Sequence, residues 1–243
     1  MKSSGSIQNS AIEYKLGGTS FHGYLAAPPR AGGKKPGVLV APEWWGLNAY
    51  ARSRAEQLAR AGYVALAIDM YGDGRITSDP RTASEWAGTC RTGPLARERA
   101  TRALQWLQEH PAVEPERIAG VGFCFGGSVM LELARSGAAV RGVTSFHGSL
   151  ATPLPAQKGV IRASVLVLHG ADDPYVSSEE LSTFQSEMRE AGADWRLCQF
   201  GNAVHSFSNP AADAAYIPGL AYNEAAARRG WQTFENFLAE TLA

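Results

Sequence analysis

The stretch Gly122–Gly127, with the sequence GFCFGG, decides the fold of this chain. It follows the apolar run 118–123 and precedes a helical pattern that carries Met130, Leu131 and Ala134. A glycine two residues before a nucleophile and another two residues after it let a strand turn sharply into a helix, because neither position has a clashing Cβ. The pattern therefore predicts a nucleophile elbow with Cys124 at its tip.

Cys124 is expected at the amino end of the helix that follows. Free N–H groups and the helix dipole stabilise a thiolate there. The N–H of Phe125 would face the oxyanion that develops on an attacked carbonyl group. A free cysteine can also be a small buried hydrophobic residue, but the strand, glycines and helix around Cys124 favour the nucleophile.

Apolar runs alternate with helical patterns along the rest of the chain. Two runs, 11–16 and 20–26, flank Gly17-Gly18 and predict an antiparallel hairpin. The run 195–200 alternates in polarity and is expected near an edge. Continuously apolar runs are typical of parallel strands covered on both faces: 37–41, 63–68, 118–123, 140–146 and 164–169. We therefore expect one α/β domain over 1–243 with a mostly parallel, doubly wound sheet.

Amphipathic stripes predict helices over 96–109 and 178–191, and Ser177 with Glu180 predicts a capping box at the start of the second. A last helix carries its apolar stripe on Ala227, Trp231, Phe234 and Leu238. The polar stretch 71–95 is too long for an ordinary connection, so we expect an active-site loop or lid there rather than an inert insertion.

Composition excludes several classes of protein. The chain has 243 residues, 45% of them apolar, and its 23 basic residues balance 23 acidic ones, which argues against nucleic acid or an anionic membrane as partner. No apolar run approaches the roughly 18 residues of a membrane span, and the polar N-terminus lacks a signal-peptide core. Three widely spaced cysteines fit a reducing compartment. We expect a cytoplasmic monomer or small homo-oligomer without metal or organic cofactor.

A cysteine nucleophile needs a base, and the base needs an acid that orients it. In folds of this kind, these residues follow later strands in the order nucleophile, acid, histidine. Asp172 and Asp173 follow the run 164–169, and His205 follows the run 195–200. We expect His205 to be the base, whereas the residues alone leave the two aspartates as alternatives.

Four other histidines compete less well for the role of base. His22 comes too early, and His110 ends a helix before a proline. His147 and His169 end central strands near any site, but each is expected to pack or to bond the backbone.

The loop 42–48, PEWWGLN, directly follows the run 37–41 and is expected to supply a second oxyanion N–H from Trp44. A carboxylate such as Glu43 is costly in an apolar loop unless it has a partner. Glu43 either caps the helix that starts near Asn48 or hydrogen-bonds the Cys124 thiol. Aromatic residues beside these motifs are expected to bind the substrate: Trp45, Tyr71, Phe123, Tyr175 and Phe207, of which Trp45 and Phe123 are equally plausible core residues.

Five motifs occur along nearly the whole chain: 42–48, 69–72, 122–127, 170–176 and 205–207. Together they resemble the dienelactone hydrolase (carboxymethylenebutenolidase) family of the α/β-hydrolase fold. The resemblance implies a Cys124–His205–Asp173 triad, with Glu43 in contact with the resting thiol. It also implies an oxyanion hole made of the N–H groups of Trp44 and Phe125, and hydrolysis of dienelactone to maleylacetate.

One departure concerns the substrate. Members of this family hold the substrate carboxylate with arginines, one of them shortly after the catalytic histidine, and the segment 205–209 has none. Arg75, Arg81 or Arg91 could replace it, although we expect all three on the solvated surface.

The expected function is hydrolysis of enol lactones or activated esters through a thioester acyl-enzyme. The first alternative is a promiscuous carboxylesterase or thioesterase with another natural substrate, which the missing arginine favours. A non-catalytic ligand-binding protein and a redox thiol protein are further alternatives. A cysteine peptidase shares these residue types, but the sequence carries no sign of an extended cleft.

Overall fold

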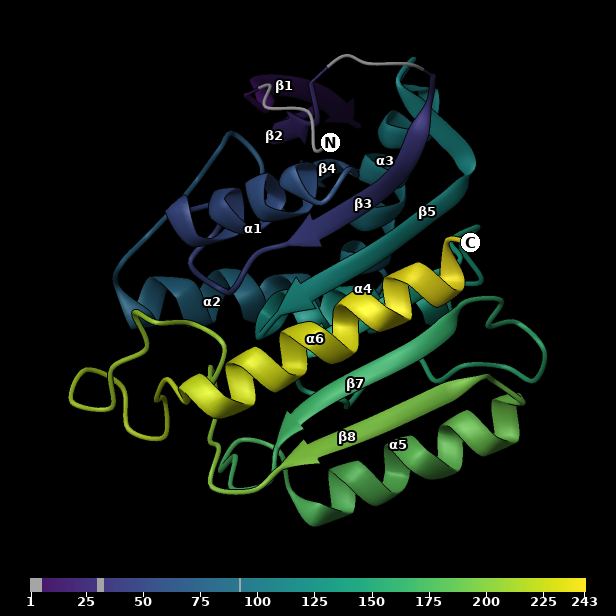
Figure 1. Ribbon diagram of the computed structural model, residues 1–243. Coiled ribbons are helices and arrows are strands. Elements are labelled where there is room, and N and C mark those ends of the chain that lie inside the picture. Colours follow the sequence, from purple (N-terminus) through teal and green to yellow (C-terminus); the bar gives the residue numbers. More distant parts are fainter. Residues whose placement is uncertain (1–5, 30–32, 92) are drawn as a thin grey trace.

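The computed structural model describes residues 6–29, 33–91 and 93–243. In this part of the chain, strands form one sheet in the order β1-β2-β4-β3-β5-β6-β7-β8 (Figure 1). The strands are β1 (Gln8–Leu16), β2 (Thr19–Ala27), β3 (Lys35–Ala41), β4 (Val64–Ala67), β5 (Val113–Phe123), β6 (Gly142–Phe146), β7 (Ser164–Gly170) and β8 (Trp195–Phe200). The pairs β1–β2 and β2–β4 are antiparallel and all others are parallel. The expected hairpin, parallel sheet and edge position of β8 are confirmed.

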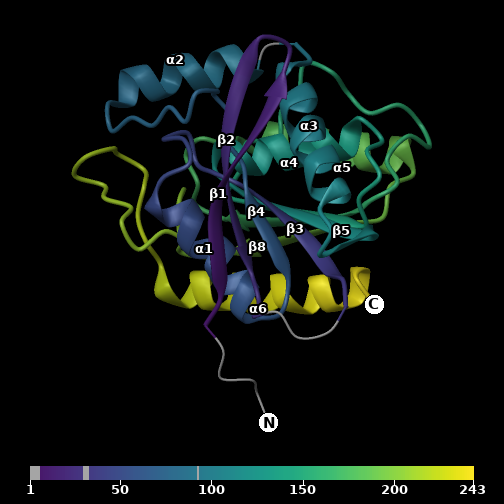
Figure 2. The same cartoon turned by 90° about the horizontal axis from the view of Figure 1, so that it is seen from above.

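Helices cover both faces of the sheet. They are α1 (Ala49–Arg60), α2 (Pro80–Arg91), α3 (Leu95–Glu109), α4 (Phe125–Arg135), α5 (Ser178–Ala191) and α6 (Glu224–Thr241). Figure 2 shows α1 and α6 on one face and the other helices on the opposite face. Alternate residues of β3 point into the two cores: Val38 belongs to the core that contains Phe234, and Leu39 belongs to the core that contains Leu104.

Three local expectations need correction. The stretch 71–95 contains the helix α2, whose small buried residues Ala83, Ala87 and Cys90 form only a weak apolar stripe. Ser177 caps α5 by accepting the N–H of Glu180, but the Glu180 carboxylate binds elsewhere, so the capping box is half formed. The buried stripe of α6 is shifted from the expected one and consists of Ala226, Gly230, Phe234, Phe237 and Leu238.

A buried ion network fastens the segment that follows β6. The Arg135 side chain is 1% exposed and pairs with Glu132 at 2.9 Å and with Glu187 at 2.7 Å. Arg135 also donates to the carbonyl of Leu150, and Arg97 pairs with Glu132 at 2.7 Å. A single element of this network cannot be removed without leaving a buried charge unpaired, so the loop after β6 is firmly held.

Candidate active site

Cys124 occupies a strained turn between β5 and α4. Its backbone has φ 52° and ψ −118°, a conformation that residues with a Cβ rarely adopt, and it takes the N-cap position of α4. A Cβ on Gly122 would lie 1.9 Å from the Gly126 carbonyl oxygen, and one on Gly126 would lie 2.3 Å from that of Ala41. The glycines of the elbow are therefore required by close backbone packing.

Asp173 and His205 meet beyond the carboxyl ends of β7 and β8. His205 Nδ1 lies 2.8 Å from Asp173 Oδ2, and Asp173 Oδ1 accepts the N–H of Tyr175 at 2.9 Å. Asp172 instead points to solvent, with its N–H bound to the carbonyl of Ala203. Of the two aspartates, Asp173 is thus the one that can orient His205.

The charge state of His205 depends on its neighbours. Burial alone would lower its pKa, but the charge of Cys124 and the hydrogen bonds that the ring donates to Asp173 and Cys124 outweigh burial and raise the pKa of His205 to about 10. The raised pKa favours the imidazolium form of His205. An imidazolium at this place stabilises a thiolate on Cys124, which is the reactive form of cysteine.

Cys124 and His205 open into one cavity of about 250 Å³. In the described part of the chain it is lined by Trp44, Arg91, Cys124, Ser149, Tyr175, Val176, His205, Ile217 and Leu220. The N–H of Phe125 belongs to the first turn of α4, where N–H groups have no partner within the helix. The loop that carries Trp44 is held by Tyr71, whose hydroxyl donates to the Trp44 carbonyl at 2.8 Å.

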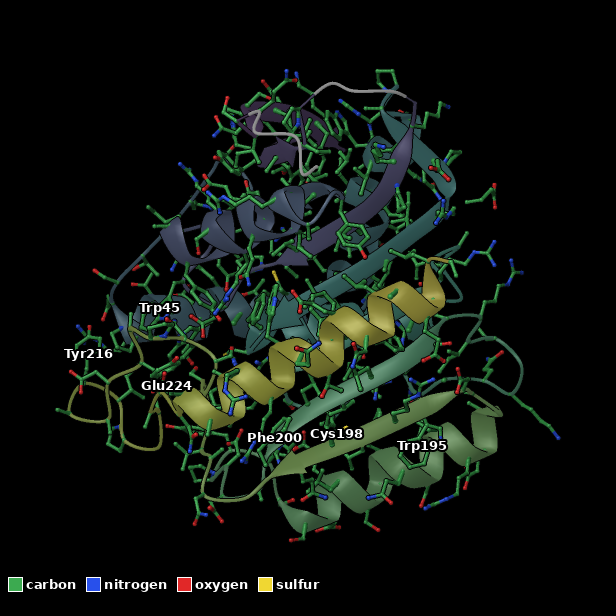
Figure 3. All side chains as sticks on the ribbon, viewed as in Figure 1. Trp45, Trp195, Cys198, Phe200, Tyr216 and Glu224 are labelled. Carbon is green, nitrogen blue, oxygen red and sulfur yellow. The ribbon has the colours of Figure 1, made fainter. Side chains whose placement is uncertain are left out.

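The expected substrate-binding aromatics are mostly placed elsewhere. Tyr175 lines the cavity, whereas Tyr71, Phe123 and Phe207 are fully buried in the core. Phe123 is the last residue of β5, directly before Cys124, and its side chain lies in the core under α1 and α6. Trp45 lines a separate small cavity, where Figure 3 shows it on the same side of the molecule as Tyr216.

The sequence analysis missed several residues of the cavity wall. Residues 210–222 cross the site, and we call them the strap. Ile217 and Leu220 belong to it and line the cavity. Ser149 follows β6, and its Oγ donates to Glu180 Oε1 at 2.8 Å. Arg91, one of the three arginines considered above, ends α2; it is exposed as expected and also lines the cavity. Only Ser149 had a readable signal, as a polar residue beyond the carboxyl end of a central strand.

Glu43 is buried but turned toward the segment after His205. Its Oε1 accepts from Ser206 Oγ at 3.2 Å and its Oε2 accepts from Asn209 Nδ2 at 2.7 Å. No hydrogen bond joins Glu43 to Cys124 in the described part of the chain, and Asn48 rather than Glu43 caps α1. The two donors explain why the expected contact with the thiol is not made. Burial raises the pKa of the Glu43 carboxyl, against the lowering effect of these hydrogen bonds.

No group of three or more His, Cys, Asp or Glu side chains in 6–29, 33–91 and 93–243 could hold a metal ion. Within the same ranges, no helix has the length and apolar character needed to cross a membrane.

The strand order and the strained residue after β5, with an acid and a histidine beyond β7 and β8, define an α/β hydrolase. The model of the dienelactone hydrolase family matches residues 21–242, and the chain belongs to this family. Its members act on lactone or ester bonds, and the protein is a hydrolase of this kind.

Individual relatives support the same conclusion. The chain is 29% identical over 233 residues to a Bradyrhizobium protein named as a probable 2-oxo-3-(5-oxofuran-2-ylidene)propanoate lactonase, with 90% of this chain and 89% of the relative covered. The solved structure m3DLH has 41% identity and a TM-score of 0.93, covering 98% of this chain and all of its own (100%). A dienelactone hydrolase-like promiscuous phosphotriesterase from metagenomic libraries has 39% identity and a TM-score of 0.93, with coverage of 98% and 100%.

Proposed function

We propose that this protein hydrolyses enol lactones or activated esters, with Cys124 as nucleophile, His205 as base and Asp173 as the acid that orients it. The proposal rests on one observation: the strained Cys124 shares a cavity with His205, which is hydrogen-bonded to the buried Asp173. A helix N-terminus and an adjacent imidazolium both favour a thiolate.

In the proposed reaction, the Cys124 thiolate attacks the carbonyl carbon, and the carbonyl electron pair moves onto oxygen. The N–H groups of Phe125 and Trp44 stabilise this oxyanion. As the oxyanion collapses, the bond to the leaving oxygen breaks and His205 gives that oxygen its proton. His205 then takes a proton from water, the hydroxide attacks the thioester, and the thiolate leaves with release of the acid.

The leaving group limits the substrates. The tetrahedral adduct can expel either the thiolate or the alcohol oxygen, and a thiol with an ordinary pKa of about 8.5 leaves more readily than an alkoxide. Simple alkyl esters therefore revert to substrate, whereas enol lactones, aryl esters and thioesters proceed. Comparable rates on ethyl and aryl acetates would contradict this argument.

Arg91 supports a substrate that carries a carboxylate. It is the one arginine or lysine among the described lining residues, and its guanidinium lies 5.6 Å from the ring centre of Phe125. Dienelactone carries a carboxylate, and the Bradyrhizobium relative is named for a lactone with a propanoate group. A cavity of about 250 Å³ fits small molecules of this size. The free cysteines support a reducing location such as the cytoplasm.

Phosphotriesters are a second candidate substrate class. The metagenomic neighbour with 39% identity over 98% of this chain is named as a promiscuous phosphotriesterase. Attack of a thiolate on phosphorus also places negative charge on an oxygen that the same N–H groups can stabilise. Slow turnover of diethyl p-nitrophenyl phosphate that depends on Cys124 would support this activity.

The deciding experiment measures kcat/KM for dienelactone and p-nitrophenyl acetate with the wild type and with Cys124→Ala. A preference for dienelactone that the variant loses supports the whole proposal, with a loss of about 10³-fold or more expected for a missing nucleophile. If the enzyme turns over only the aryl ester, and this turnover still depends on Cys124, the proposed mechanism is retained but dienelactone is excluded as a substrate. Cys198→Ala is the matched control, because this cysteine lies on β8, apart from the residues that line the cavity (Figure 3).

A separate experiment tests the alternative of a redox thiol protein. Free thiols are titrated before and after mild peroxide, and simultaneous loss of two thiols would favour the redox protein over the hydrolase.

A further inference from the structure

His147 is fully buried and contacts the backbone of Cys124. It follows β6 and has φ 41°, a left-handed conformation that is uncommon for a residue with a Cβ. This turn brings its Nδ1 to 3.1 Å from the Cys124 backbone nitrogen, whose N–H is shared with the carbonyl of Phe146 at 3.0 Å. His147 Nδ1 therefore accepts a hydrogen bond from the nucleophile's own backbone.

The other ring nitrogen reaches the segment that carries the base. A neutral imidazole that accepts at Nδ1 has its proton on Nε2, and His147 Nε2 lies 2.8 Å from Ser208 Oγ. Ser208 comes three residues after His205, and its hydroxyl is 3.0 Å from that of Tyr50 on α1. Arg54 donates to the Ser208 carbonyl at 2.9 Å. Hydrogen bonds thus connect the elbow, the base-bearing segment and α1.

The protonation of His147 suits this role. Its ring packs edge-on against that of His205, with ring centres 5.4 Å apart. Burial and the neighbouring charge of His205 both hold the pKa of His147 well below its usual range, so its ring stays neutral. A neutral ring keeps Nδ1 free as an acceptor and does not repel the imidazolium of His205.

We propose that His147 is a positioning residue that fixes the Cys124 backbone against segment 205–208 and so sets the separation of the Cys124 sulfur and the His205 ring. This inference rests on the proposed function and deepens it. It assigns a task to a histidine outside the triad, and it predicts that losing the link weakens the thiolate–imidazolium pair without altering the cavity wall.

The test compares His147→Leu, His147→Asn and Ser208→Ala. Leucine removes both hydrogen bonds, whereas asparagine tolerates positive φ and places Oδ1 where Nδ1 accepts the Cys124 N–H. Thr144→Val is the matched control, since the Thr144 hydroxyl is buried on β6, the strand directly before His147, and has no partner among the described residues. We measure kcat and KM for p-nitrophenyl acetate, and the rate of Cys124 alkylation by iodoacetamide against pH.

We expect His147→Leu to lower kcat about 100-fold with little change in KM, the loss that follows a displacement of about 1 Å in a catalytic group. Its alkylation profile should move to higher pH, because a weaker ion pair leaves less thiolate near neutral pH. His147→Asn should recover most of the wild-type kcat. The kcat of Ser208→Ala should lie between those of His147→Leu and the wild type. Thr144→Val should match the wild type.

An alkylation profile of His147→Leu identical to that of the wild type, or an asparagine variant no better than leucine, would overturn the proposal. If the leucine variant does not fold, an alkylation profile of Ser208→Ala identical to that of the wild type has the same consequence, because Ser208→Ala removes the hydroxyl that joins His147 to the segment after His205. Full activity of Cys124→Ala would instead refute the proposed function, so the two failures are distinct.

Discussion

The two walls of the cavity are fastened to the fold in different ways. Cys124, Asp173 and His205 directly follow strands or lie within a few residues of them, and they are 9%, 6% and 8% exposed. The opposite wall comes from the end of α2, from Tyr175, which is 50% exposed, and from the strap, in which Leu220 is the one buried residue. Under the proposed function, the reacting groups are therefore built on the sheet, whereas substrate choice depends on surface segments that can change without disturbing the sheet.

The largest effect should come from the wall that carries Cys124, Asp173 and His205. Asp173→Asn keeps the size of the side chain but removes the carboxylate that orients His205, so we expect kcat to fall about 10³–10⁴-fold. Steady-state kinetics with an aryl ester measures this loss. Asp172→Asn is the control, because Asp172 is exposed and should stay within about threefold of the wild type, as surface changes do. Equal losses in the two variants would contradict the assignment of the acid.

Arg91→Ala tests the opposite wall and should have a smaller, selective effect. Loss of a partly solvated charge contact lowers kcat/KM for a carboxylated lactone about tenfold, while p-nitrophenyl acetate, which has no carboxylate, is unaffected. Arg81→Ala provides the control, since that side chain is 95% exposed. A parallel loss on both substrates would show that Arg91 supports the fold rather than the substrate.

Tyr216→Phe examines how the strap is tied down. The Tyr216 hydroxyl donates to the carbonyl of Ser78 at 2.8 Å, and further along, the Ala221 N–H donates to the carbonyl of His205. Removing one exposed hydrogen bond should raise KM about threefold and leave kcat unchanged. A fall in kcat alone would mean that the strap controls the catalytic residues as well.

Glu43→Gln should change stability more than activity. The pKa of the buried Glu43 carboxyl is raised, so the folded wild type loses stability as pH rises past the ordinary carboxyl pKa. Glutamine does not titrate and can still bond Asn209. We therefore expect the variant to be more stable at pH 7 by about 1–2 kcal/mol, and equal near pH 4, in urea unfolding. A less stable variant at pH 7 would show that the carboxylate charge is needed.

The sequence predicted that Cys124, Asp173 and His205 lie together, because each of them follows a recognisable apolar strand. Parallel strands place their carboxyl ends at one edge of the sheet, so Cys124, Asp173 and His205 had to come together once the strands were located. The choice of Asp173 over Asp172 needed the family resemblance, because neighbouring aspartates differ only in the turn that orients them.

The remaining features depend on contacts that no local pattern encodes. The partners of Glu43, Ser206 and Asn209, are more than 160 residues away in the chain. The helix α2 buries mainly small side chains, which carry a weak periodic signal. The strap has almost no apolar pattern, since its residues face solvent or the cavity.

The buried network around Arg135 has a consequence for behaviour on heating. The dehydration penalty of buried charges falls as temperature rises, so Arg135, Glu132 and Glu187 continue to hold the loop that carries Ser149 in a warm protein. The strap has few buried contacts and loosens at a lower temperature. Warming should therefore erase the discrimination between carboxylated lactones and simple aryl esters before it stops turnover, so that selectivity and rate have separate thermal limits.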